Sequence, residues 1–373
     1  MLRDAALLHL DLLMESLGED MTMKDASSFN VQWFGSSPVF IDVASFERLT
    51  PGAPWAGYRQ FCSLFLYPLM LQAYRNVSFQ PWLRGNIEGI DPVEFRRLFA
   101  FRDALRPGIL MDVLVQAKLQ SRYAGSTAKV RDDLRRSGFH KEMIAANLRR
   151  LRKIVSGLRW KQPGSTWSDY ATDNSYSATD GGRKEAFVRQ VVAARHRKLV
   201  WDLGCNTGVY SHIASENADY VVAMDSDHLA VERMYRSLRS DRRETILPLV
   251  INVANTSPGQ GWRGSERRTL EDRGKPDLVL ALALLHHIVI SANVPLDAFL
   301  DWLGSLGSDV VVEFVTKDDP MTKRLLQNKE DQYADYTLPN LEQSLQKSFR
   351  IARREELASG TRFLYYAESL AHR

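Results

Sequence analysis

A turn that carries two glycines and an aspartate has the composition of a ligand-binding loop. The turn follows the apolar run 199–203 and contains Gly204 and Gly208, and Asp202 stands two residues before the first glycine. Glycine lets the backbone bend sharply and lets a ligand approach within contact distance. A carboxylate at this place suits a cationic amino-acid group and would repel a pyrophosphate. The loop therefore predicts a ligand that is positively charged near Asp202.

The spacing of these glycines differs from that of the dinucleotide fingerprint. The fingerprint reads Gly-x-Gly-x-x-Gly, whereas this chain reads Asp-x-Gly-x-x-x-Gly, with Asn206 between the glycines. A second carboxylate, Asp225, ends the next apolar run and lies 21 residues after Gly204. An acid at that position can accept hydrogen bonds from both ribose hydroxyls. Together the loop and the acid predict a nucleoside ligand.

The elements that must position these residues alternate between short apolar strands and helices. Such alternation predicts a parallel sheet covered by helices on both faces. Strands are expected at residues 198–203, 220–225, 246–250, 278–283, 310–314, 349–352 and 363–367, and helices at 183–195, 209–216, 229–240 and 294–306. The last two strands are joined by residues 353–362, which leave no room for a crossover helix. That closing pair must therefore be antiparallel.

The region from about residue 165 to residue 373 resembles the core of class I methyltransferases that use S-adenosylmethionine (SAM). The resemblance rests on the glycine loop, the acid after it and the seven predicted strands. It implies an α/β fold, namely a Rossmann-like seven-stranded sheet with an antiparallel last strand, and SAM as the cofactor. Asn206 stands where the family usually has glycine. Carried over to this chain, the implied cofactor-binding residues are Asp202, Gly204, Cys205, Asn206, Gly208, Asp225, Ser226, Asn252, Val253 and Leu282.

Three segments resemble a narrower group within these methyltransferases. Residues 277–287 and 312–321, together with the N-terminal residues 55–62, are similar to methyltransferase-like proteins grouped with host-specificity nodulation proteins of rhizobia. This resemblance extends over nearly the whole chain. It brings no assignment of a substrate.

Three residues are candidates for catalysis in that architecture. His286 and His287 follow the fourth strand, at the edge that faces the transferable methyl group. An imidazole can accept a proton because its ordinary pKa lies near neutrality. Successive helical residues point about 100° apart, so at most one histidine is expected to face the substrate and a packed histidine is the alternative. Glu313 lies inside an apolar strand, where a carboxylate must be paired, hydrated or part of a pocket.

Residues 1–160 are predicted to form a mainly helical accessory domain that shapes the acceptor site. Helical spacing covers residues 4–17, 58–74, 92–101 and 109–123, an apolar stripe runs from Met143 to Leu158, and a short strand is expected at 38–42. Asp25, Asn30 and Asp42 resemble the catalytic-loop and metal-binding residues of kinase-like phosphotransferases. No glycine-rich loop or strand lysine precedes them, so an ordinary helical domain is favoured over a remnant of a kinase lobe.

Two polar segments are candidates for contacts with ligands. Residues 161–182 are rich in Pro, Gly, Ser and Asp, which predicts a linker or lid before the domain formed by residues 183–373. Trp167, Tyr170 and Tyr176 could fold over the cofactor, or could simply anchor the linker. The loop 256–275, with Trp262 and Arg263, is a further candidate for contact with the substrate.

The composition predicts a soluble, cytoplasmic protein of two domains. The chain has 373 residues, of which 45% are hydrophobic and 25% charged, and its two cysteines lie far apart, which argues against a disulfide scaffold. We expect no signal peptide, membrane-spanning helix or metal site. The net charge of +4 does not by itself imply a nucleic-acid partner, but residues 131–161 hold ten Lys or Arg against three Asp or Glu. A solvated helix face is the favoured interpretation of this basic segment.

The favoured function is SAM-dependent methyl transfer to a small-molecule or metabolite acceptor. Methylation of nucleic acid, RNA in particular, is the alternative suggested by the basic segment, although no Asn/Asp-Pro-Pro-Tyr/Phe tetrad follows the fourth strand. A non-catalytic scaffold that binds SAM is the third interpretation.

Overall fold

The computed structural model describes residues 1–118, 141–161 and 178–372. The chain divides into two compact units. Unit 1 comprises Met1–Trp33 and Ser37–Gln162, and unit 2 comprises Phe34–Ser36 and Pro163–Arg373. Trp167, Tyr170 and Tyr176 lie outside the described residues, as does the first part of the basic segment.

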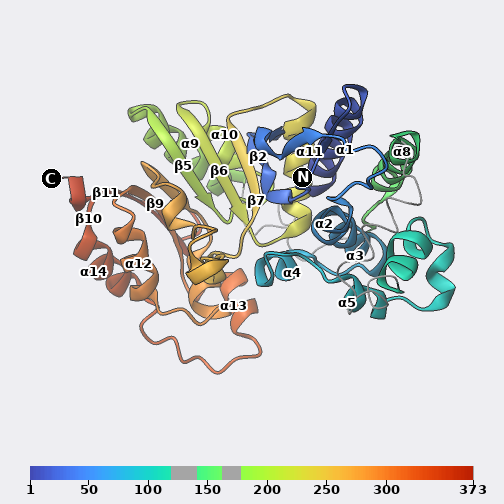
Figure 1. Cartoon of the computed structure of the whole chain (residues 1–373). Coiled ribbons are helices and arrows are strands. Elements are labelled where there is room, and N and C mark those ends of the chain that lie inside the picture. The colour runs from blue at the N-terminus through green and yellow to red at the C-terminus, as the bar shows by residue number, and fades with distance from the viewer. Residues whose placement is uncertain (119–140, 162–177, 373) are drawn as a thin grey trace. The chain divides into compact units, whose positions relative to one another are not determined.

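Unit 1 is built around two long helices that pack against each other, α1 (Leu2–Gly18) and α8 (Lys141–Gly157). Leucines and isoleucines at helical spacing on these helices are buried in one core, but Met143, which was predicted to begin the apolar stripe, is 53% exposed and does not belong to the buried face. The helices expected at 58–74 and 92–101 are present, the second only as far as Arg97, and the helix expected at 109–123 is described as far as residue 118 (Figure 1). These segments form α2 (Tyr58–Phe61), η3 (Cys62–Leu66), α3 (Tyr67–Arg75), α5 (Pro92–Arg97) and η5 (Ile109–Val115), where η marks a short 3-10 or π-helical turn. Two further elements, α4 (Gln80–Gly85) and η4 (Phe101–Leu105), were not expected from the sequence.

Unit 1 also contains short strands. β1 (Met21–Met23) pairs antiparallel with β4 (Phe46–Arg48), and β2 (Val31–Phe34) pairs with β3 (Ser37–Phe40). Only β3 lies where the sequence predicts a strand. The other three have three or four residues each, which is too short for an alternating pattern to be recognised.

The seven-stranded sheet of unit 2 confirms the predicted fold. Its strand order is β10-β11-β9-β8-β5-β6-β7. Five strands are parallel, and β11 runs antiparallel to both of its neighbours, β9 and β10. The strands are β5 (Arg197–Leu203), β6 (Ala218–Asp225), β7 (Ile246–Val250), β8 (Leu278–Ala281), β9 (Asp309–Val315), β10 (Phe349–Glu356) and β11 (Arg362–Ser369).

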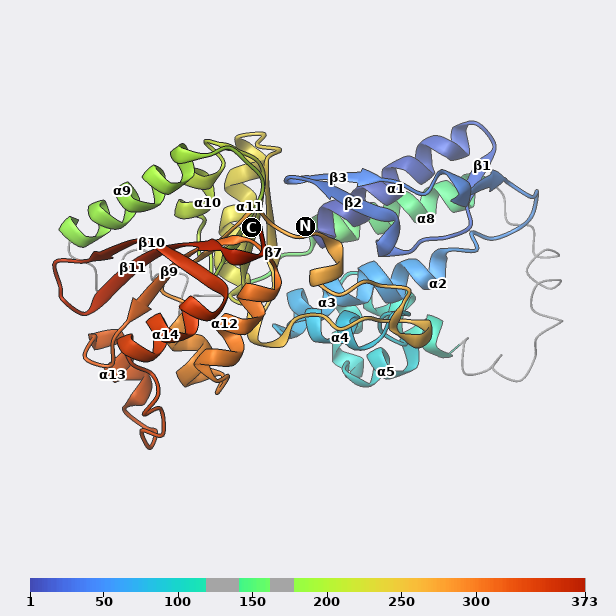
Figure 2. The ribbon, with the colours of Figure 1, turned by 90° about the vertical axis from the view of Figure 1, so that its left-hand side faces the viewer.

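Helices cover both faces of this sheet (Figure 2). Side chains of a strand alternate between faces, so Val200 and Leu280 pack in one core while Trp201 and Ala281 pack in the other. The first core lies under α9 (Ala178–Ala194), α10 (Val209–Ala214) and α11 (His228–Ser240). The second lies under α12 (Leu296–Ser305) and α14 (Leu338–Ser348), with α13 (Pro320–Leu326) beyond them.

Several boundaries differ from the sequence-based expectation, and two of the differences concern elements of the site. β8 ends at Ala281 rather than at residue 283, because Ala283 has a left-handed backbone with φ of 50° that cannot continue a strand. Helix α9 begins at Ala178, inside the segment expected to be a linker.

Candidate active site

The glycine loop joins β5 to α10 and is tied to the end of β6. Gly204 and Gly208 have φ of 74° and 91°, and a Cβ on Gly208 would lie 2.5 Å from Cε of Met234. The backbone N–H groups of Gly204 and Cys205 both donate to the carbonyl of Met224, at 2.8 and 3.0 Å. These positions therefore require glycine for backbone shape and, at Gly208, for space.

Asn206, which stands between the two glycines, also has a left-handed backbone, with φ of 49°. Asparagine tolerates this conformation better than most residues do. Its own side-chain oxygen accepts a hydrogen bond from the backbone N–H of Thr207 at 2.7 Å. The substitution of asparagine for the usual glycine is thus compatible with a tight loop.

Asp202 and Asp225 lie at the carboxyl ends of neighbouring strands. Asp202 is 2% exposed and accepts a hydrogen bond from the Ser211 hydroxyl at 2.5 Å, while burial raises its pKa to about 6. Asp225 accepts hydrogen bonds from the backbone N–H groups of Asn206 and Asp227, both at 2.8 Å. Burial raises the pKa of Asp225 as well. Each carboxylate is fixed by local bonds before any ligand arrives.

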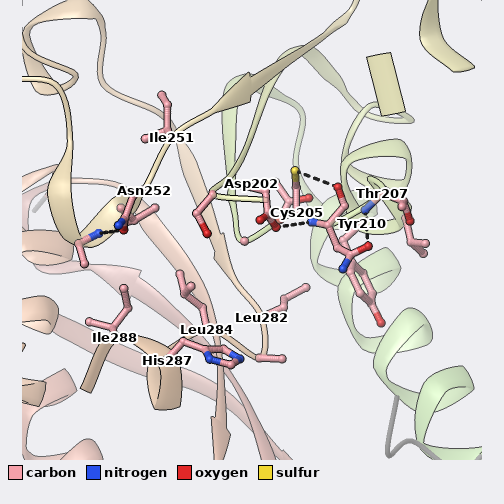
Figure 3. A pocket seen from close by; sticks show the side chains of 18 of the residues that line it. Asp202, Cys205, Thr207, Tyr210, Ile251, Asn252, Leu282, Leu284, His287 and Ile288 are labelled. Carbon is pink, nitrogen blue, oxygen red and sulfur yellow. Dashed lines mark hydrogen bonds between the residues drawn. The ribbon is translucent and has the colours of Figure 1, made fainter. Parts of the chain in front are cut away.

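A cavity of about 740 Å³ opens beside these residues. It lies at the carboxyl ends of β5, β6, β7 and β8, where ligands bind in open α/β sheets. Of the residues expected to bind the cofactor, all except Gly208 line it. Figure 3 shows Asp202 and Cys205 with His287 and Leu284 below them. Burial raises the pKa of the Cys205 thiol, so the thiol stays protonated at neutral pH.

The two candidate histidines occupy different environments. His287 begins the π-helical turn η9 (His287–Ser291) and lines the cavity, and burial lowers its pKa to about 4. His286 is fully buried behind it, does not line the cavity, and has no hydrogen-bond partner on either ring nitrogen among the described residues. Single π-helical turns within helices are frequent at functional sites. Of the two imidazoles, only that of His287 can meet a ligand in this cavity.

The comparison with known proteins connects the chain to one curated relative. No family model matches the sequence. The chain is 35% identical over 372 residues to the nodulation protein NoeA of Rhizobium meliloti (strain 1021), and the match covers 98% of this chain and 77% of that protein. The chain belongs to the NoeA family.

Solved structures similar to this NoeA-family chain include rhizobial and archaeal proteins. The N-methyltransferase NodS of Bradyrhizobium japonicum WM9, crystallised with S-adenosyl-L-homocysteine (SAH), is 10% identical, with a TM-score of 0.39 over 56% of this chain and 100% of NodS. Protein PH0226 of Pyrococcus horikoshii OT3 is 13% identical, with a TM-score of 0.39 over 55% of this chain and 96% of PH0226.

Several cavity residues of the NoeA-family chain were not predicted from the sequence, and one of them is a buried cation. Lys184 of α9 is 3% exposed and lines the cavity, and its Nζ lies 2.7 Å from Oε2 of Glu313. Glu313 is fully buried and does not line the cavity, so it meets the site only through Lys184. A signal was present in the sequence, because Lys184 stands three and four residues before Phe187 and Val188, both buried on the same helix face.

Other candidates named from the sequence lie away from this cavity. Trp262 is 76% exposed, and neither it nor Arg263 lines the cavity. In unit 1, the side-chain amide of Asn30 donates to Asp42 at 3.1 Å, and Asp25 accepts from the backbone N–H of Ser27 at 2.8 Å. Any role of these kinase-like residues stays a prediction.

Within residues 1–118, 141–161 and 178–372, His, Cys, Asp and Glu side chains nowhere gather in threes that could hold a metal ion. Among the same residues, every helix is too short or too polar to span a membrane.

Proposed function

We propose that this chain is a SAM-dependent methyltransferase that acts on a small-molecule acceptor. One observation carries the proposal: a cavity at the carboxyl ends of four parallel strands is flanked by a glycine loop and by two carboxylates, Asp202 and Asp225. The pair of acids suits a nucleoside with a cationic end and disfavours a diphosphate. The volume of about 740 Å³ falls within the range of small-molecule sites.

Different lining residues would contact different parts of SAM. Asp225 would accept hydrogen bonds from the ribose, and Asn252, Val253 and Leu282 would contact the adenine. The glycine loop and Asp202 would hold the amino-acid end. When bound, SAM supplies a methyl group activated by its positive sulfur.

The chain's own task is then to orient the acceptor and to receive its proton where the acceptor carries one. His287 is the lining residue suited to that task, because burial keeps its imidazole neutral at neutral pH and so able to accept a proton. His286 would act behind it as a packing residue. Glu313 would act through Lys184 rather than on the acceptor.

Calorimetry with the purified full chain tests the cofactor assignment. We expect both SAM and SAH to bind with one site per chain. Because the pKa of Asp202 is about 6 and a cationic ligand favours its charged form, SAM affinity should decrease as the pH falls through 6. Absence of binding to either compound at pH 7.5 would overturn the proposed function.

Transfer of labelled methyl from SAM into fractionated cell extract tests the reaction and the class of acceptor. Label in small molecules supports the proposal, and His287→Ala should reduce the rate about 100-fold, more than His286→Ala does in folded protein. Label in RNA would instead support methylation of nucleic acid, the alternative suggested by basic side chains such as the exposed Arg149 and Lys153 of α8. SAM binding without any labelled product would indicate a non-catalytic binding protein.

A further inference from the structure

The buried ammonium group of Lys184 lies in the wall of the cavity, and the function proposed above assigns it no contact with a ligand. We propose that Lys184 binds the carboxylate of the amino-acid end of SAM, and that Glu313, Arg362 and Asp319 hold it in place. This inference rests on the proposed function and assigns one of its contacts. It makes Lys184 a binding residue and the other three positioning residues.

The surroundings of Lys184 are those of a fixed cation. The residue is 3% exposed, its Nζ lies 2.7 Å from Oε2 of Glu313, and it lies 4.6 Å from the centre of the Tyr210 ring. Tyr210 also lines the cavity. A buried lysine loses rotational freedom when it is packed in this way, so less freedom remains to be lost when a ligand binds. Its position is therefore preorganised.

The charge of Glu313 is shared between two cations. Nη1 of Arg362 lies 3.3 Å from Oε1 of Glu313, on the other side of the carboxylate from Lys184. Arg362 in turn bonds Asp319, with Nε 2.8 Å from Oδ2 and Nη2 3.2 Å from Oδ1. The four side chains carry two positive and two negative charges and balance each other. Because an ammonium has three N–H donors, Lys184 can serve Glu313 and a ligand carboxylate together.

The position of this cluster in the fold places its cation near Asp202. Asp202 and Lys184 both line the cavity; burial lowers the pKa of Lys184, and the nearby charges of Glu313 and Asp202 oppose that lowering. An anion and a cation side by side match a zwitterion. Asp202 would take the α-ammonium of the ligand and Lys184 its α-carboxylate, which a lone carboxylate at this end of the cavity could not hold.

The cluster also has a structural anchor outside the cavity. Asp319 caps α13, accepting a hydrogen bond from the backbone N–H of Met321 at 2.9 Å. Arg362 begins β11, the antiparallel strand that enters the sheet beside β9. The orientation of Lys184 is therefore set by elements that lie more than a hundred residues after it in the chain.

Ligands that differ only at the carboxylate test the proposal by calorimetry. Decarboxylated SAM lacks that group, and 5′-methylthioadenosine lacks the whole amino-acid end. We expect the wild-type chain to bind SAM about 10- to 100-fold more tightly than decarboxylated SAM, the effect of a hydrogen bond to a charged group. Lys184→Met should abolish this preference and change the affinity for decarboxylated SAM and 5′-methylthioadenosine less than about threefold.

Two further variants control for loss of folding and for the removal of a lysine outside the cavity. Lys184→Met leaves the buried Glu313 with one cation fewer, which can destabilise the fold. The double variant Lys184→Met/Glu313→Gln removes both charges of the pair and so avoids an uncompensated buried charge. This double variant should also lack the preference for SAM. Lys198→Met removes an exposed lysine of β5, outside the cavity, and should keep the preference. Thermal unfolding without ligand identifies the variants that are folded.

The possible outcomes distinguish a failure of the proposed function from a failure of the Lys184 assignment. If the wild type binds none of the three compounds, the proposed function fails. If it binds them without preferring SAM, or if the folded double variant keeps the wild-type preference, the assignment of Lys184 fails and the proposed function stands. If Lys184→Met weakens the binding of all three compounds equally, Lys184 only supports the cavity wall and its assignment as a binding residue fails as well.

Discussion

Unit 1 and unit 2 each bury a carboxylate that is paired with basic side chains, but the two clusters differ in their relation to the cavities of the described residues. In unit 1, the fully buried Asp112 receives two N–H groups of Arg150, at 2.7 and 2.6 Å, and the hydroxyl of Tyr58 at 2.5 Å. None of these residues lines the 370 Å³ cavity of unit 1. In unit 2, Glu313 bonds Lys184, which does line a cavity.

The difference shows why a buried charge is by itself a weak sign of function. Asp112 joins η5 to α8, so its bidentate contact with Arg150 specifies how two helices pack. Lys184 and Glu313 also join two elements, α9 and β9, but they leave a cation in the wall of the site. Burial together with access to a cavity, rather than burial alone, is the reason for proposing a ligand contact at the cluster of unit 2.

The largest effect should follow from breaking the cluster of unit 1. Arg150→Met leaves the buried Asp112 without its cation, which costs about 3–5 kcal/mol for a buried pair. We expect a matching decrease in the free energy of unfolding, measured with urea, and an unchanged SAH affinity in the folded protein. A large loss of SAH affinity would contradict the division between a packing cluster and a binding cluster.

Acid should destabilise unit 1 through a different buried group. His9 is fully buried among aromatic rings, neither ring nitrogen has a hydrogen-bond partner among the described residues, and burial lowers its pKa to about 4. The unfolded chain binds this proton below about pH 6.5, whereas the folded chain does not until about pH 4. Proton uptake by the unfolded chain therefore lowers the free energy of unfolding by about 3 kcal/mol as the pH falls from 6.5 towards 4.

Urea unfolding of wild type and His9→Leu between pH 7 and 4 measures that share. The difference in unfolding free energy between the two proteins should change by about 3 kcal/mol across this interval. Equal pH dependence in both proteins would show that His9 is not the responsible group.

In unit 2, removing one charge at the cavity should affect ligand binding more than stability. Asp225→Asn keeps the size of the side chain but removes the carboxylate, so SAH affinity should fall about 10- to 100-fold by calorimetry. Asp219→Asn changes an exposed acid on the same strand, β6, and serves as the matched control. Equal effects of the two substitutions would argue against a ribose contact at Asp225.

The smallest effects concern two glycines of unit 2. Gly208→Ala places a Cβ 2.5 Å from Met234 at a φ of 91° and should cost about 1–2 kcal/mol of stability. Gly182→Ala lies in helix α9, where a Cβ meets nothing within 4 Å, and should stabilise the chain by up to about 1 kcal/mol. Thermal unfolding of the two variants should shift in opposite directions; a shift in the same direction would contradict the glycine argument.

Local patterns were sufficient to predict the architecture of unit 2. Its strands are apolar runs bounded by polar turns, and the short link between residues 353 and 362 already required an antiparallel closing pair. Helices α13 and α14 escaped prediction. Unit 1 was less predictable, because its strands β1, β2 and β4 have three or four residues each and depend on their partners rather than on their own pattern.

The sequence by itself determined the features that neighbouring residues create: strand and helix periodicity, the bends at Gly204 and Gly208, and the acids that end two strands. Tertiary structure alone decided which side chains meet across the chain. It paired Lys184 with Glu313, 129 residues later, and turned His287 rather than His286 towards the cavity. The physical reason is that burial and charge pairing depend on packing between distant elements, which local spacing does not record.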